Sequence, residues 1–85
     1  MIWVTNATKT SGTYKLQLEF NDGLKGFVDF KNILENDHRA IVRELLDTKM
    51  FNSFVVENDT VCWKNGMDFA PEFLYEMALN YKKVA

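Results

Sequence analysis

Few side chains in this sequence have the chemistry of catalysis, and their spacing does not group them. His38 is the only histidine and Cys62 the only cysteine among the 85 residues. Only Asp37 adjoins His38 as a candidate partner, so we expect a partly buried packing histidine at a helix start rather than a base or a metal ligand. Cys62 lies in a predicted strand beside Trp63, whereas a nucleophilic thiolate needs a helix N-terminus or a basic neighbour. We therefore expect an inert core cysteine.

Three carboxylates, Asp68, Glu72 and Glu76, are spaced four residues apart near the C-terminus. On a helix this spacing brings Glu72 and Glu76 onto one face, where they could supply two oxygen ligands to a hard cation. A calcium site needs a loop rich in Asp and Asn with six or more oxygens, and the sequence has no such loop. Lys64-Asn-Gly66 is too short for a phosphate-binding P-loop. We therefore expect capping and a solvated face, no metal or cofactor, and no enzyme.

The composition is that of one small folded domain spanning residues 1–85. Hydrophobic residues make up 47% of the chain and aromatic residues 14%, which is enough for a core. A single cysteine excludes an intramolecular disulfide, and no apolar run approaches the roughly 18 residues of a membrane span. The N-terminal Met-Ile-Trp-Val-Thr lacks the basic and apolar regions of a signal peptide. We expect a cytoplasmic protein that does not bind membranes.

The charge balance disfavours nucleic acid as a partner of this chain alone. Ten lysines and arginines face twelve carboxylates, which gives a net charge of −2. Nucleic-acid binding relies on clustered cations that neutralise phosphates. Arg39, Arg43 and Lys49 form one basic region, and Lys82 and Lys83 form another. Neither region is interleaved with aromatic side chains that could stack on bases.

The first third of the sequence predicts three antiparallel strands. Residues 2–8 form the first strand, and residues 14–20 alternate apolar and polar side chains as a half-buried strand does. Asn21-Asp-Gly23 then marks a hairpin turn into a third strand over residues 24–30.

The length of that turn sets the register of the hairpin. A two-residue turn would place Leu16 opposite Asp29 and so bring charge onto the buried face. A three-residue turn with Gly23 in the left-handed conformation places Leu16 opposite Val28 and pairs opposite charges on the outer face. The three-residue turn is therefore predicted. It leaves Phe27 on the otherwise polar face.

A helix is predicted next, capped by Asn36 or Asp37 and continuing to about Asp47, after residues 29–35 have ended the strand and formed a turn. The apolar stripe of this helix comprises His38, Ile41, Val42, Leu45 and Leu46.

The C-terminal half predicts a second hairpin and a final helix. Residues 54–57 and 60–63 pair around Asn58-Asp59, two residues that tolerate left-handed geometry. Residues 64–67 form a tight turn, and Asp68 caps the final helix. The broad apolar face of that helix comprises Ala70, Phe73, Leu74, Met77, Ala78 and Tyr81.

These elements predict an α+β fold in which an antiparallel sheet of about five strands, the N-terminal strand plus two hairpins, packs with two helices. The segments Leu18-Glu-Phe-Asn-Asp-Gly-Leu-Lys-Gly-Phe-Val-Asp-Phe30 and Thr60-Val-Cys-Trp-Lys-Asn-Gly-Met-Asp-Phe-Ala-Pro-Glu-Phe-Leu-Tyr75 resemble a bacterial family, the domain of unknown function DUF2442. The resemblance covers about residues 1–80 and implies the same fold. In that family some members carry a following helix-turn-helix domain, and some are encoded beside a second short protein. The second arrangement suggests a toxin–antitoxin or regulatory pair.

Aromatic side chains suggest where such a protein could bind. Phe27 on a charged strand face, and Tyr75 with Leu79 on the shoulder of the final helix, are apolar groups that the predicted geometry fails to bury. Contiguous exposed apolar groups are typical of binding surfaces. We therefore expect a non-catalytic interaction module that binds a protein partner or a second copy of itself through Phe27, Tyr75 and Leu79. The alternative is a regulatory domain associated with a small ligand or with nucleic acid.

Overall fold

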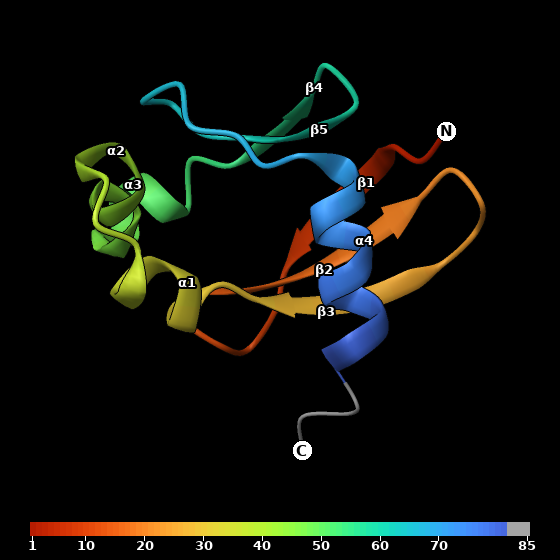
Figure 1. The fold of residues 1–85 in the computed structure, drawn as a ribbon, viewed down its shortest axis with the longest axis horizontal. Helices are drawn as coiled ribbons and strands as arrows, with labels where there is room; N and C mark the ends of the chain where they lie inside the picture. The colour runs from red at the N-terminus through yellow and green to blue at the C-terminus, as the bar shows by residue number, and fades with distance from the viewer. Residues whose placement is uncertain (82–85) are drawn as a thin grey trace.

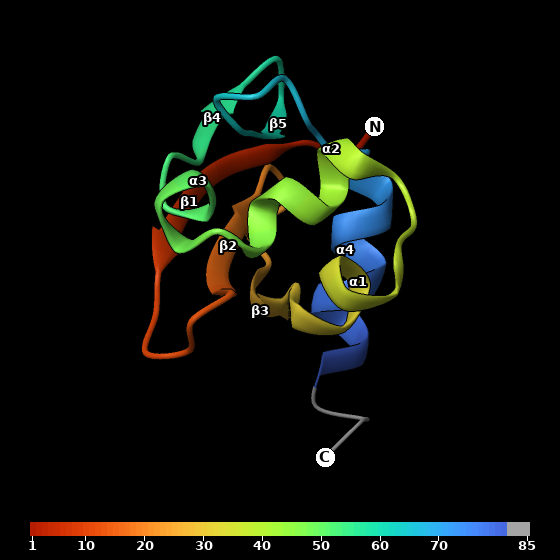
Figure 2. The ribbon, with the colours of Figure 1, turned by 90° about the vertical axis from the view of Figure 1, so that its left-hand side faces the viewer.

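The computed structural model describes residues 1–81 and has an α+β architecture (Figure 1). Its elements in chain order are β1 (Val4–Lys9), β2 (Lys15–Phe20), β3 (Lys25–Asp29), α1 (Lys31–Asn36), α2 (Ala40–Arg43), the 3-10 helix η1 (Glu44–Leu46), α3 (Thr48–Phe51), β4 (Val55–Glu57), β5 (Thr60–Cys62) and α4 (Pro71–Asn80). Helix α4 crosses one face of the sheet formed by β1, β2 and β3, while α1, α2 and α3 gather at one end of the molecule (Figures 1 and 2).

The first hairpin has the predicted three-residue turn. Gly23 adopts a φ of 92°, and Leu16 pairs with Val28 across β2 and β3. On the outer face Lys25 Nζ lies 3.7 Å from a carboxylate oxygen of Glu19. The register therefore follows from the left-handed glycine and from the charge pairing, as the sequence indicates.

The second hairpin also has its predicted register, with Val56 opposite Val61. Asn58 and Asp59 adopt φ values of 52° and 68°, which is the geometry of a two-residue turn between twisted strands. The prediction of five antiparallel strands in an α+β fold is confirmed, with three strands in one sheet and two in the other. The backbone N–H of Val4 donates to the carbonyl of Asp59 at 2.9 Å and joins β1 to the second hairpin.

The segment after β3 differs from the prediction. Lys31–Asn36 forms helix α1, where a turn was expected, because Leu34 is buried in the core. Just before the helix, Asp29 Oδ1 accepts a hydrogen bond from the backbone N–H of Lys31. The next helix begins at Ala40, later than predicted. Asp37 instead binds the backbone and side chain of Arg39, which holds the chain extended there.

His38 consequently lies outside any helix and is exposed, so the expected partly buried packing role is wrong. Helix α2 continues as the 3-10 helix η1 and buries Val42 and Leu45 from the predicted stripe. Ile41 remains 37% exposed.

Helix α4 begins at Pro71 with Ala70 as its N-cap, so the prediction that Asp68 caps it is wrong. Asp68 instead continues the extended chain and pairs with Cys62 through a β-bridge. The turn before it is as predicted, with Gly66 at a φ of 91°. Because the extended pairing runs on past the turn, the helix starts at the proline, whose missing N–H costs nothing there.

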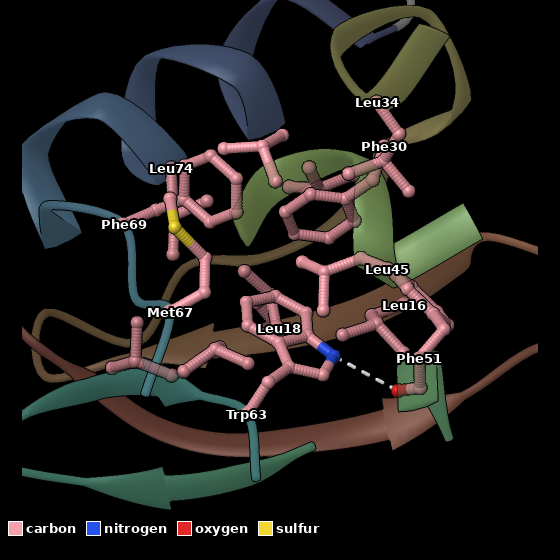
Figure 3. Packing of buried hydrophobic residues seen from close by; sticks show 14 of the residues in the cluster. Leu16, Leu18, Phe30, Leu34, Leu45, Phe51, Trp63, Met67, Phe69 and Leu74 are labelled. Carbon is pink, nitrogen blue, oxygen red and sulfur yellow. Dashed lines mark hydrogen bonds between the residues drawn. The ribbon is translucent and has the colours of Figure 1, made fainter. Parts of the chain in front are cut away.

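The core lies between the sheet, α4 and the short helices (Figure 3). Its centre is a group of aromatic rings whose centroids lie 5.5–5.8 Å apart, from Phe30, Phe51, Trp63 and Phe69. Trp63 Nε1 donates to the carbonyl of Phe51 at 2.9 Å, which satisfies the one polar atom of the buried indole. Of the helices in residues 1–81, none has the length and apolar character needed to cross a membrane.

Candidate functional site

Phe27 is half-buried on the outer face of the first sheet. The ring of Tyr81, at the C-terminal end of α4, lies 5.6 Å from its ring, and the Lys15 ammonium lies 5.5 Å from its ring centroid. Lys15 also donates to the Tyr81 hydroxyl at 3.2 Å. This aromatic side chain on a charged strand face is therefore covered in part by a cation and by a second ring.

Tyr75 connects α4 to the turn of the first hairpin. Its ring meets Phe20 edge-to-face with centroids 5.0 Å apart, and its hydroxyl donates to Asp22 Oδ2 at 2.5 Å. This hydrogen bond lowers the pKa of Asp22, with a further contribution from the Leu24 N–H, and raises the pKa of Tyr75. Both the ring and the hydroxyl of Tyr75 therefore already make contacts that join α4 to the first hairpin.

Leu79 lies one helical turn beyond Tyr75 on the same flank of α4 and is 44% exposed. Phe27 points to the face of the sheet opposite the one that α4 covers, because strand neighbours alternate and Gly26 contacts the helix. Tyr75 and Leu79 therefore lie on the same flank of α4, whereas Phe27 lies on the other face of the sheet. Their binding of a partner stays a prediction.

The opposite flank of α4 forms one side of an open groove of about 910 Å³, and α1 forms the other side. Ile33 from α1 and Phe73 and Met77 from α4 provide its apolar lining. Phe73 is 45% exposed although its ring stacks on Phe69 at 6.0 Å and 21°. A second, smaller hollow shares Ile33 and Phe73 and extends the groove toward residues 67–70.

The other residues that line the groove are charged or polar, and we refer to them as its rim. They are Asp29, Lys31, Asn32, Glu35, Glu76, Asn80 and Tyr81. At the second hollow Arg39 hydrogen-bonds Asp37 and lowers the pKa of that carboxyl to about 2. The lining thus combines apolar side chains with charged and polar ones, as recognition surfaces do.

One sequence pattern indicates the α1 side of this groove, but it was interpreted as a turn. Phe30, Ile33 and Leu34 are spaced as on one face of a helix, but residues 29–35 were predicted to be a turn. Phe73 was placed on the buried face of the final helix. Both sides of the groove were therefore missed.

The chemistry-bearing side chains remain apart in the structure. Cys62 is half-buried and lies outside the core, so the expected core position is wrong. Burial, more than the nearby Asp68 charge, raises the pKa of the Cys62 thiol, which makes a nucleophilic thiolate less accessible. Among residues 1–81, no three His, Cys, Asp or Glu side chains gather into a group that could hold a metal ion. Of the basic regions, Arg43 contacts the carbonyl of Glu35 at 3.3 Å, while Lys82 and Lys83 lie outside the described residues.

These features define a small α+β domain with two antiparallel hairpins and a helical groove. The chain belongs to the family of proteins of unknown function DUF2442, which it matches over residues 4–79. Comparison with curated proteins and with solved structures found no match to the chain.

Proposed function

We propose that this protein is a non-catalytic interaction module that binds a segment of a partner protein in the groove between α1 and α4. The observation that supports this most directly is Phe73, a phenylalanine 45% exposed in a hollow that Ile33 and Met77 also line. An exposed aromatic side chain in the lining of a hollow is the kind of group that carries binding energy in protein interfaces.

The groove is a stronger candidate than the flank predicted from the sequence. Single exposed apolar side chains are ordinary on protein surfaces, and Leu79 is one of these. Tyr75 already packs on Phe20 and binds Asp22. Several apolar side chains adjoin one another in the groove, and contiguity is what distinguishes a binding surface.

In the cell we propose a cytoplasmic role as one half of a two-protein pair, either a neutralising, antitoxin-like subunit or a regulatory subunit. Such a role needs an exposed recognition surface and no catalytic group, which agrees with the scattered His38 and Cys62. The groove volume of about 910 Å³ also lies within the range of small-ligand sites. A small ligand is therefore the competing occupant.

The experiment uses two residues that are matched in exposure. Phe73 and Leu79 lie on opposite flanks of α4 and are 45% and 44% exposed. We would capture partners on the tagged 85-residue chain from its native lysate, using wild type, Phe73→Asp and Leu79→Asp, after circular dichroism has shown all three to be folded.

The proposal expects a stoichiometric protein on wild type and Leu79→Asp that is absent from Phe73→Asp. Loss of the captured protein only with Leu79→Asp would show that the partner binds the Tyr75 and Leu79 flank, and would overturn the groove as the site. Equal capture by all three forms, or capture of nothing but a small molecule, would overturn a protein-binding groove.

A further inference from the structure

Among the described residues 1–81, the rim of the groove between α1 and α4 carries an excess of negative charge. Asp29, Glu35 and Glu76 contribute three carboxylates, and Lys31 contributes one cation. All four residues are exposed. Within residues 1–81, none of the three carboxylates forms an ion pair. Asp29 Oδ1 accepts a hydrogen bond from the backbone N–H of Lys31. All three carboxylates line the groove together with the apolar side chains of Ile33, Phe73 and Met77.

An occupant of this groove meets two kinds of surface at once. Its apolar side chains replace water at the centre, and its flanking side chains meet the carboxylates at the edge. Complementary charge at an interface accelerates encounter and rejects partners of the wrong sign. Lys or Arg beside apolar anchors fits both surfaces, whereas Asp or Glu in those places would be repelled.

The same charges argue against two other occupants. In a symmetric dimer formed through this groove, the same patch on both copies would meet, so each copy would bring three carboxylates and one lysine into the interface and the net charge there would be negative. Nucleic acid would bring phosphates to a rim of the same sign, whereas its recognition depends on neutralising cations.

We infer that the groove selects a basic amphipathic segment, in which apolar anchors are flanked by Lys or Arg, from another protein chain. This inference rests on the proposed function, because it specifies the chemistry of the partner that the groove binds. It adds a role for Glu35 and Glu76, which line the groove from α1 and α4.

A random 16-residue peptide library displayed on phage is the probe. It would be selected in parallel on the wild-type chain, on Phe73→Asp, and on the double variant Glu35→Lys/Glu76→Lys. We expect wild type to enrich peptides with apolar anchors and a clear excess of Lys and Arg over Asp and Glu. The double variant should enrich the opposite charge, and Phe73→Asp should enrich neither set.

One enriched basic peptide would then be synthesised and titrated calorimetrically. Reversing two rim charges turns several attractive charge pairs into repulsive ones, so we expect its Kd to rise about tenfold on the double variant. A similar rise on Gln17→Lys, a charge change on the outer face of β2, would show a general charge effect and overturn the inference.

The outcomes separate the inference from the proposed function. Peptides that need Phe73 but are neutral or acidic would overturn the basic partner and leave the groove as a protein-binding site. Absence of any enrichment over Phe73→Asp would overturn both. A dimer seen by light scattering in wild type and lost in Phe73→Asp would replace the basic partner with a second copy of the chain.

Discussion

Helix α4 has two flanks with nearly equal exposure of one large apolar side chain each, Phe73 at 45% and Leu79 at 44%. On the Leu79 flank the first hairpin reaches the helix, and Tyr75 packs on Phe20 and binds Asp22. On the Phe73 flank the neighbouring element is the short helix α1, and the space between the two helices is open. Exposure alone therefore does not mark a site. The neighbouring element decides whether an apolar flank of the helix is held by contacts within the chain or is open to a partner.

Leu74 lies between the two flanks and is fully buried, so it supports both. We expect Leu74→Ala to lower the free energy of unfolding by about 2–5 kcal/mol, because it leaves a cavity under the helix. Urea unfolding at neutral pH would measure the loss. A change below 0.5 kcal/mol would mean that α4 contributes little to the fold and that neither flank is rigid.

Gly26 sets how closely α4 approaches the sheet. A Cβ built on Gly26 would lie 2.8 Å from Cβ of Ala78, well inside normal contact. We expect Gly26→Ala to cost about 1–3 kcal/mol, as overpacking does, by pushing the helix from β3. The unfolding free energies of Gly26→Ala, Ala78→Gly and the double variant form a cycle that measures the coupling.

The clash predicts that Ala78→Gly recovers part of the loss in the Gly26→Ala background, although the same change alone costs about 1 kcal/mol through helix propensity. Strictly additive losses would show that the two positions do not press on each other.

This close approach also explains what the sequence could and could not predict. Both hairpin registers follow from local chemistry, since Gly23 and the Asn58-Asp59 pair accept positive φ where few residues do. The orientation of α4 does not. The sequence predicts both Ala78 and Phe73 on the apolar face, but Ala78 packs against Gly26 whereas Phe73 lies partly exposed at the groove.

The groove could not be predicted from the local sequence because one of its two helices, α1, depends on tertiary packing. Helix α1 has six residues, too few to be stable alone, and it exists because Leu34 is buried in the core. Its sequence reads as a strand end and a turn until that contact is known. A site formed by two helices cannot be predicted when one of them depends on tertiary packing.

The tether on the Leu79 flank should respond to pH. The pKa of Asp22 is lowered below 3.8 in the folded state, so its contribution to stability is present above pH 3.8 and is lost as the pH falls through the folded value. The pKa of Tyr75 is raised above 10.0, so its contribution is present below pH 10 and is lost as the pH rises through the folded value.

We expect Tyr75→Phe, which keeps the ring on Phe20, to destabilise the protein less than either core variant does. The difference from wild type should be constant near neutrality and shrink below pH 3.8 and above pH 10. Asp22→Asn should remove the same acid dependence. A difference that stays constant down to pH 2 would show that the hydroxyl does not act through the Asp22 carboxylate.

The smallest effect is expected at Leu79. Leu79→Lys replaces an exposed side chain near the end of α4 with a good helix former, so the free energy of unfolding should change by no more than about 0.5 kcal/mol. Phe73→Lys should cost more, because Phe73 gives up its stacking on Phe69 even though the two residues are equally exposed. Urea unfolding of the two variants side by side tests this difference. Equal losses would mean that the groove flank holds its aromatic side chain no more firmly than the other flank holds its leucine. Phe73 would then lack the fixed position that a preorganised anchor requires.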